Sequence, residues 1–246
     1  MKSLQIKVKE SYITGFIHES ELDNGYVLII SHGFRGSIDG GNAYEIAERA
    51  SKLGFKAVRY NFTPCRPLST QIEELAAVVK YCTKNLSNKI ILMGRSMGGS
   101  ATIAYSANYF KPEGLILWAT PTDLDECFRL ILKDEYNKLK NGKTLKIEDE
   151  KGKVILEPAF VTSITKYNLQ KDINDISNKG IDILFIHGDS DSVVPLKQTI
   201  EVFNNSKANE ELHVIKGAAH DFEGYKNQIT EITINWLKML HQGKHI

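Results

Sequence analysis

Short runs of almost unbroken apolar residues recur along the chain and alternate with segments in which apolar residues have helical spacing. The run at residues 26–31, YVLIIS, leaves no polar face for solvent. A strand of this kind must be covered on both sides, as the strands of parallel sheets are. Alternating strands and helices with short connections therefore predict an α/β fold with a mostly parallel, twisted sheet and helices on both faces. We expect strands at 26–31, 55–62, 89–93, 114–118, 181–187 and 212–215, two short strands within 4–18, and helices at 42–52, 71–84, after residue 96 and at 225–240.

Composition is that of an ordinary globular protein and narrows the choice of partners. Of the 246 residues, 42% are hydrophobic and 25% are charged, and the net charge is +1. A nearly neutral chain gives no reason to expect a nucleic acid or an anionic membrane surface as the main partner. No stretch approaches the roughly 20 apolar residues of a membrane-spanning helix. The first ten residues also lack the apolar core of a signal peptide.

The cysteines point to a reducing compartment. They are odd in number and have no CxxC spacing, so they do not form a disulfide framework. Together with the absence of a recognisable targeting segment, this leads us to expect free thiols and a cytoplasmic protein. The three residues are Cys65, Cys82 and Cys127.

One segment interrupts the alternation of strands and helices. Residues 123–178 follow an expected strand but are much longer than an ordinary crossover, and loops of that length are usually functional or disordered. The first half is amphipathic and charged, and the second half is hairpin-like around Lys151-Gly152. We predict a small cap inserted into a single domain that spans residues 1–246, with most of its aromatic side chains packed on the body and one or two facing substrate. Its larger apolar side chains are Phe128, Leu132, Tyr136, Phe160 and Tyr167.

A serine flanked by glycines stands between an expected strand and an expected helix. Residues 94–98 read GRSMG, a G-x-S-x-G pattern that Gly99 extends. A serine in a sharp strand-to-helix turn has a strained backbone, and larger neighbours would collide across the turn. Its hydroxyl stands at a helix N-terminus, where the dipole favours negative charge. We predict that Ser96 is a catalytic nucleophile. The alternative is a turn that packs or binds phosphate, although no Gly-Lys-[Ser/Thr] follows it.

A serine nucleophile needs a base and a group that orients the base. On such a sheet both belong in loops after later strands, with the acid before the histidine. Among seven histidines, His220 lies between the last expected strand and the closing helix, so we assign it as the base. Asp189 and Asp191 both follow the strand at 181–187. Asp189 is suited to fixing the turn, and we choose Asp191 as the acid. We expect His187 to pack and hydrogen-bond beneath that turn.

The oxyanion that forms on attack needs two N–H donors. One belongs to Met97, directly after Ser96. We expect the other in the loop at 31–42, SHGFRGSIDGGN, where glycines let the backbone approach a substrate closely. The matching donor is the Phe34 N–H, and the Phe34 ring would then line the acyl side of the pocket. The alternative is a flexible surface loop.

The segments SHGFRGS, GRSMGGS, HGDSDSVVP and AAHDF, in this order, resemble the α/β-hydrolase superfamily. More narrowly, the chain is similar to small bacterial carboxylesterases close to the feruloyl esterases and the serine-aminopeptidase-like hydrolases. The resemblance runs from residue 26 to the closing helix. The family pattern HGxxDxxVP also puts the acid on Asp191, and the family's inserted lid corresponds to residues 123–178. One departure follows VRYNF, where Arg59 matches a family arginine: the usual glycine- and serine-rich turn is replaced by residues 63–67, TPCRP, a stiffer and basic loop.

The resemblance implies a serine esterase that forms an acyl-enzyme with Ser96, His220 and Asp191, binds a small-molecule ester, and uses no metal or organic cofactor. A peptidase, amidase or thioesterase of the same fold is the alternative. Amide cleavage asks more of the general acid, because an amine leaves less easily than an alkoxide. A nonenzymatic binding protein is disfavoured, since such proteins usually lack a triad member. The oligomeric state is left open, with a homodimer among the options.

Overall fold

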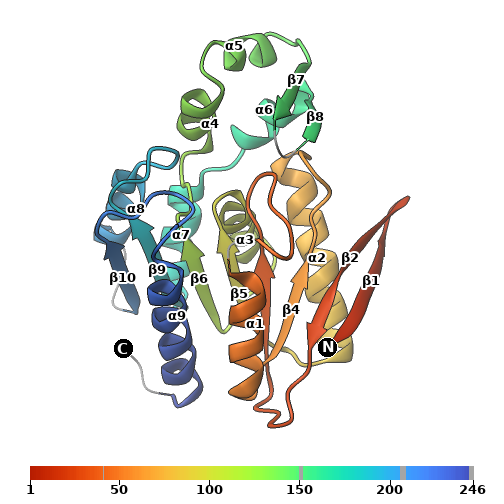
Figure 1. Cartoon of the computed structure of the whole chain (residues 1–246), viewed down its shortest axis with the longest axis vertical. Coiled ribbons are helices and arrows are strands. Elements are labelled where there is room, and N and C mark those ends of the chain that lie inside the picture. Colours follow the sequence, from red (N-terminus) through yellow and green to blue (C-terminus); the bar gives the residue numbers. More distant parts are fainter. Residues whose placement is uncertain (41, 150–151, 206–208, 244–246) are drawn as a thin grey trace.

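An eight-stranded sheet runs through the middle of the molecule, which the computed structural model describes at residues 1–246 except 41, 150–151, 206–208 and 244–246 (Figure 1). The strand order is β1-β2-β4-β3-β5-β6-β9-β10. β1 and β2 form an antiparallel hairpin at one edge, and β2 pairs antiparallel with β4. From β4 to β10 all neighbouring strands are parallel, which confirms the predicted sheet. The strands are β1 (Lys2–Val8), β2 (Ser11–His18), β3 (Tyr26–Ser31), β4 (Lys56–Tyr60), β5 (Lys89–Arg95), β6 (Gly114–Trp118), β9 (Asp182–Gly188) and β10 (Glu210–Ile215).

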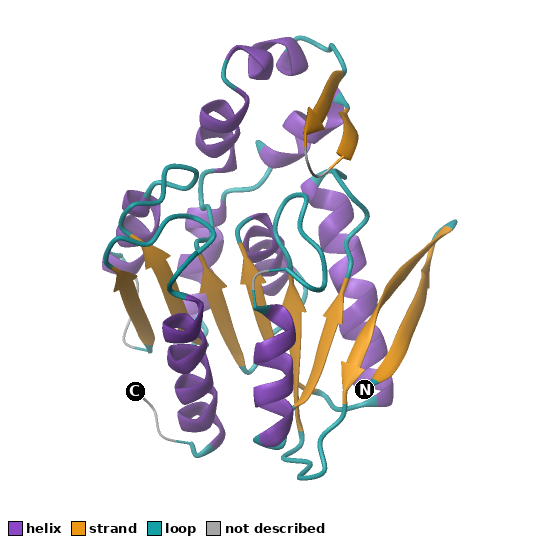
Figure 2. Ribbon diagram, viewed as in Figure 1, coloured by secondary structure: helices purple, strands orange, loops and turns teal. Residues whose placement is uncertain are grey.

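The apolar runs are buried because alternate residues of each strand enter two different cores. In β3, Val27 and Ile29 belong to one core, whereas Leu28 and Ile30 belong to the other. Helices lie in front of the sheet and behind it (Figure 2). None of the helices in the described ranges is both long and apolar enough to cross a membrane. One core is covered by α2 (Leu68–Asn85), α3 (Met97–Asn108), α7 (Leu169–Asn178) and α8 (Leu196–Asn204), and the other by α1 (Ala43–Lys52) and α9 (Lys226–His241).

The segment between β6 and α7 rises above the ends of the strands to which the arrowheads point (Figure 1). It contains two helices, a two-stranded hairpin and a third helix. The hairpin strands pair antiparallel, from Leu145 opposite Leu156 to Asp149 opposite Gly152. The expected turn at Lys151-Gly152 lies partly outside the described residues. The elements are α4 (Leu124–Leu132), α5 (Asp134–Lys140), β7 (Leu145–Asp149), β8 (Gly152–Leu156) and α6 (Pro158–Ile164).

The last part of the predicted insertion is a helix of the main body. α7 packs against α3 beside the sheet. Its apolar positions Leu169, Ile173 and Ile176 are buried in the core that α2 and α3 also cover. The residues that stand above the sheet therefore end near Ile164, before the predicted boundary at residue 178. Amphipathic spacing identifies such a helix but does not say which surface it covers.

Candidate active site

Ser96 lies in a sharp turn between a strand and a helix at the centre of the sheet. β5 ends at Arg95, and α3 begins at Met97. The backbone of Ser96 has φ 52° and ψ −131°, a region that costs a residue with a side chain about 1–3 kcal/mol. Its N–H donates to the carbonyl of Trp118 at 2.8 Å, which anchors the turn to the neighbouring strand β6. The turn aims the serine side chain out of the sheet.

Glycines on both sides make this turn possible. A Cβ on Gly94 would lie 2.4 Å from the Cα of Gly99, and a Cβ on Gly98 would lie 2.3 Å from the carbonyl oxygen of His32. Both distances are far below van der Waals contact, and the obstructing atoms are backbone. The glycines of the GRSMGG motif are therefore required by the close approach of α3 to β5 and to the loop after β3.

His220 reaches Ser96 from a loop at the far end of the chain. This loop connects β10 to α9, and Nε2 of His220 lies 3.1 Å from Ser96 Oγ. Phe222 anchors the loop two residues later: it has φ 56°, is fully buried, and packs edge-on against Trp118 at 6.1 Å. Since 124 residues separate serine and histidine in the chain, the fold itself brings them together.

Asp191 completes a hydrogen-bonded row with these two residues. Its Oδ2 lies 2.8 Å from Nδ1 of His220, and its Oδ1 accepts the N–H groups of Val193 and Val194 at 2.8 Å each. The side chain is fully buried. Burial alone raises the pKa of this carboxyl, but the hydrogen bonds with His187, His220 and Val194 outweigh it, so the pKa lies well below its usual range. Asp191 is thus an ionised acceptor for the imidazole.

Asp189, the alternative acid, is exposed and has a different task. Its Oδ1 accepts the N–H of Gly217 at 2.6 Å, and its own N–H donates to Ile215 at 3.2 Å. These bonds tie the loop after β9 to the loop that carries His220. The structure therefore brings Asp191, and not Asp189, to the histidine.

His187 supports Asp191 from below. Its Nε2 lies 2.9 Å from the carbonyl oxygen of Val194 and 3.3 Å from Oδ2 of Asp191, and its Nδ1 lies 2.7 Å from the Thr199 hydroxyl. A carbonyl can only accept, so we assign the proton to Nε2 and the acceptor role at Nδ1 to the hydroxyl. Sequence reasoning expected a histidine beneath the turn but missed its contact with the carboxylate. The spacing of four residues between His187 and Asp191 in HGDSD was the signal in the sequence for this contact.

The two predicted oxyanion donors belong to segments that meet at Ser96. A Cβ on Gly33 would lie 2.9 Å from Cβ of Ser96, so the loop after β3 runs against the nucleophile. Met97 is the first residue of α3, where backbone N–H groups have no partner within the helix. In the described part of the chain, neither the Phe34 nor the Met97 N–H donates to a protein acceptor. Both are available to a ligand.

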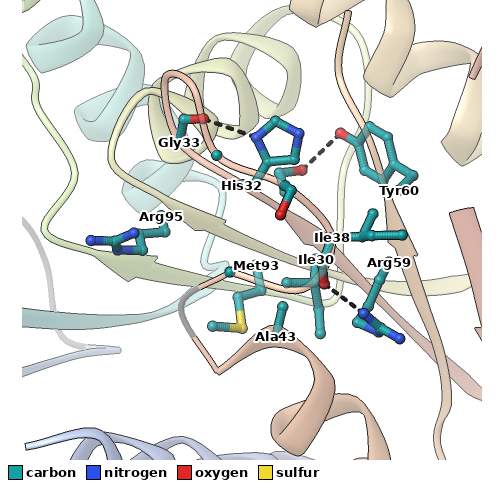
Figure 3. A pocket seen from close by; sticks show the side chains of 13 residues that line it. Ile30, His32, Gly33, Ile38, Ala43, Arg59, Tyr60, Met93 and Arg95 are labelled. Carbon is teal, nitrogen blue, oxygen red and sulfur yellow. Dashed lines mark hydrogen bonds between the residues drawn. The ribbon is translucent and has the colours of Figure 1, made fainter. Parts of the chain in front are cut away.

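Side chains of β4 and of the connections after β3 and β4 hold the oxyanion loop, residues 33–40, in place (Figure 3). His32 Nδ1 lies 2.8 Å from the Gly33 carbonyl, and its Nε2 accepts the N–H of Phe62 at 3.0 Å. Burial lowers the pKa of His32, which the bond to Gly33 offsets only in part, so the ring is neutral at pH 7. Arg59, almost fully buried, donates to the carbonyl of Ile38 at 2.5 Å. These hydrogen bonds hold residues 33–40 in a defined conformation, so the loop is not the flexible surface loop of the alternative interpretation.

The cap contacts the oxyanion loop through an aromatic cluster. The Phe34 ring lies 5.2 Å from Phe128 of α4 and 5.6 Å from Phe160 of α6, and these two rings lie 4.8 Å apart. Both cap rings are buried, whereas Phe34 is half-buried. Arg35 adds a polar contact, since its Nη2 donates to the Gly152 carbonyl of the hairpin at 2.8 Å. The predicted packing role of the cap aromatics holds for Phe128 and Phe160.

The basic loop at residues 63–67 forms one wall of a pocket of about 260 Å³ beneath the cap. Ile155, Glu157 and Phe160 form the other wall. The N–H of Thr63 donates to the buried Glu74 carboxylate at 3.1 Å, which fixes the start of this loop. Among the described residues, no group of three or more His, Cys, Asp or Glu side chains is placed to hold a metal ion.

Solved structures of other proteins match nearly the whole chain. Est1E from Butyrivibrio proteoclasticus with bound ferulic acid has a TM-score of 0.84 at 18% identity, covering 96% of this chain and 98% of its own. The α/β hydrolase GrgF from Penicillium sp. sh18 has a TM-score of 0.75 at 17% identity, covering 99% and 98%. This chain has the α/β-hydrolase fold.

A third α/β hydrolase is described as a serine hydrolase without a lid. It is XC6422 from Xanthomonas campestris, with a TM-score of 0.65 at 16% identity, covering 98% of this chain and 92% of its own. No family model matches the sequence, and no curated protein matches it either. Because α/β-hydrolase folds carry many different activities, the chemistry must be derived from the residues of this site.

Proposed function

We propose that this α/β hydrolase is a serine esterase that cleaves carboxylic esters through an acyl-enzyme. The observation that carries the proposal is the row from Ser96 Oγ to His220 Nε2 at 3.1 Å and from His220 Nδ1 to Asp191 Oδ2 at 2.8 Å. A nucleophile, a base and an orienting carboxylate within hydrogen-bond reach are the parts that acyl transfer to serine requires.

In the first half of the reaction, Ser96 Oγ attacks the ester carbonyl while His220 Nε2 takes its proton. Asp191 fixes the tautomer with the proton on Nδ1, which leaves Nε2 free to accept, and its charge then stabilises the imidazolium. The short bonds from Val193 and Val194 to the carboxylate prevent it from turning away. This step converts the carbonyl oxygen into an oxyanion.

The N–H groups of Phe34 and Met97 supply the donors for that oxyanion. Met97 also opens α3, a helix of 12 residues whose N-terminus favours negative charge. Removing one such donor typically costs about 100- to 1,000-fold in turnover. The rigid support of the oxyanion loop by His32 and Arg59 therefore contributes to the rate, because donors fixed before reaction need no reorganisation.

The collapse of the tetrahedral intermediate completes acylation. The C–O bond to the leaving group breaks, and His220 returns its proton from Nε2 to the departing alkoxide. Water then attacks the acyl-enzyme by the same route: His220 accepts a proton from the water, the bond from the acyl carbon to Ser96 Oγ breaks, His220 returns the proton to Ser96 Oγ, and the acid leaves. Amides and thioesters would use the same groups. An ester is favoured over an amide because its alkoxide is a better leaving group than an amine, and the substrate panel separates esters from thioesters.

A substrate panel with Ser96→Ala as the decisive variant tests this function. The panel holds p-nitrophenyl esters of several chain lengths, methyl ferulate, an acyl thioester and aminoacyl anilides. We expect ester hydrolysis by the native protein and a loss of about 1,000-fold or more in Ser96→Ala, with little change in melting temperature.

Ser106→Ala is the matched control on the same helix. Its buried hydroxyl has no hydrogen-bond partner among the described residues, so we expect native turnover. Ester hydrolysis that survives in Ser96→Ala would contradict the mechanism. Faster cleavage of the anilides or the thioester than of any ester would move the assignment to the peptidase or thioesterase alternative.

A further inference from the structure

We propose that Arg95 is a positioning residue that holds the His220 loop against the nucleophile. This inference rests on the proposed function. The observation behind it is a hydrogen bond from Arg95 Nη2 to the backbone carbonyl of His220 at 3.1 Å. It links the residue before the serine to the histidine 125 positions later.

Arg95 lies on a rigid part of the sheet from which it can hold the His220 loop in place. It is the last residue of β5 and pairs with Trp118 of β6, so its backbone belongs to the centre of the sheet. Its carbonyl oxygen would lie only 3.2 Å from a Cβ on Gly33, which places it beside the oxyanion loop. In Figure 3 its side chain lies at the edge of the drawn pocket, away from Arg59. One residue thus borders the nucleophile, the oxyanion loop and the His220 loop.

The surroundings of the guanidinium favour this role over that of a simple ion pair. Burial lowers the pKa of Arg95, while the nearby charges of Asp221 and Asp191 oppose that change. Arginine stays protonated in proteins. Its buried Nε has no partner among the described residues. The guanidinium therefore donates to the His220 carbonyl as a charge-assisted bond, which is stronger than a neutral one.

The His220 imidazole depends on this backbone bond for its placement. Among the described residues, Arg95 is the donor that reaches the His220 carbonyl. We expect loss of the bond to loosen the backbone between Ala218, whose carbonyl accepts the Ser190 N–H at 3.1 Å, and the buried Phe222. A displacement of the base by about 1 Å can cost on the order of 100-fold in rate. Substrate binding to the oxyanion loop and the cap does not depend on the exact position of the imidazole, so KM should change little.

The experiment compares Arg95→Met and Arg95→Lys with the native protein on p-nitrophenyl acetate. We expect Arg95→Met to lose about 10- to 100-fold in kcat with KM within about threefold. Arg95→Lys restores the charge and a donor, so its kcat lies between the two. Arg49→Met is the matched control, since it removes a partly exposed arginine that pairs with Glu231 at 2.7 Å far from Ser96.

A second measurement is independent of catalysis. The downfield NMR signal of the His220 Nδ1–H, identified by its absence in His220→Gln, should broaden or disappear in Arg95→Met and remain in Arg49→Met. An Arg95→Met protein with native kcat and a native Nδ1–H signal would overturn the proposal. If Arg95→Met does not fold, Arg95→Gln replaces it under the same expectations. If the native protein hydrolyses no ester, the proposed function fails, and the NMR comparison still decides the role of Arg95.

Discussion

At the scale of single residues, Asp191 is the most constrained group in the site. It is fully buried, accepts two backbone N–H groups on one oxygen, and faces His220 and His187 with the other. In Asp191→Asn, the amide would present a donor to His220 and favour the wrong tautomer. We expect turnover to fall roughly 1,000- to 10,000-fold with native secondary structure, as measured by initial rates and circular dichroism.

Asp189→Asn is the natural comparison, because the two aspartates lie two residues apart. Asp189 is exposed and bonds the N–H of Gly217, so its variant should lose thermal stability and keep turnover within a few-fold. Loss of turnover in Asp189→Asn alone, with an unchanged melting temperature, would show that the acid is wrongly assigned.

The sequence identified some of these residues and not others for a physical reason. Ser96 and its glycines form a local motif, and the order of acid and histidine follows from the strands that carry them. Arg95 and His187 act through contacts with His220 and Asp191 that depend on the path of two loops. For His187 the four-residue spacing to Asp191 was a signal in the sequence, whereas the contact of Arg95 with a residue 125 positions later shows only in the folded chain.

At the scale of elements, we expect the aromatic contact between cap and oxyanion loop to limit the size of the acyl group. The Phe34 ring contacts Phe128 and Phe160 of the cap, and we propose that these rings form one wall of the acyl pocket. Binding energy from remote parts of a substrate is applied at such walls. We therefore expect the packing of these rings against Phe34 to affect selectivity through the position of the Phe34 ring.

Phe128→Leu tests this assignment. The smaller side chain opens space beside Phe34, so kcat/KM for a bulky acyl ester should rise several-fold relative to that for an acetate ester, whose own value should change little. Leu132→Ala, one turn further along α4 and buried in the same core, is the control for cap stability. Equal changes for all esters in both variants, in step with lost thermal stability, would mean that the cap is only structural.

The elements were predictable where the pattern was regular. The strands and the helices α1, α2, α3 and α9 follow from apolar runs and helical spacing, and their bounds agree to within a few residues. The insertion was expected at 123–178, but α7 belongs to the main body because its apolar face packs against α3. The shape of the oxyanion loop also depends on distant partners, since Ile38 bonds Arg59 and Asn61 from β4 and the residue that follows it.

At the scale of the whole molecule, the fold brings four distant segments to one edge of the sheet. Ser96 follows β5, Asp191 follows β9, His220 follows β10, and the oxyanion loop follows β3. All four are connections at the ends of parallel strands, where ligands bind in open α/β sheets. The cap covers the same edge (Figure 1). We propose that Ser96 becomes covalently acylated at this edge.

Covalent labelling tests directly whether Ser96 is the nucleophile. The native protein is treated with a fluorophosphonate, and the adduct is located by intact mass and peptide mapping. We expect one phosphonyl group, on the peptide that contains Ser96, no labelling in Ser96→Ala, and labelling slowed by about 1,000-fold or more in His220→Gln, because the base that activates the serine is gone. A folded native protein that forms no adduct, or an adduct on another residue that persists in Ser96→Ala, would contradict the account.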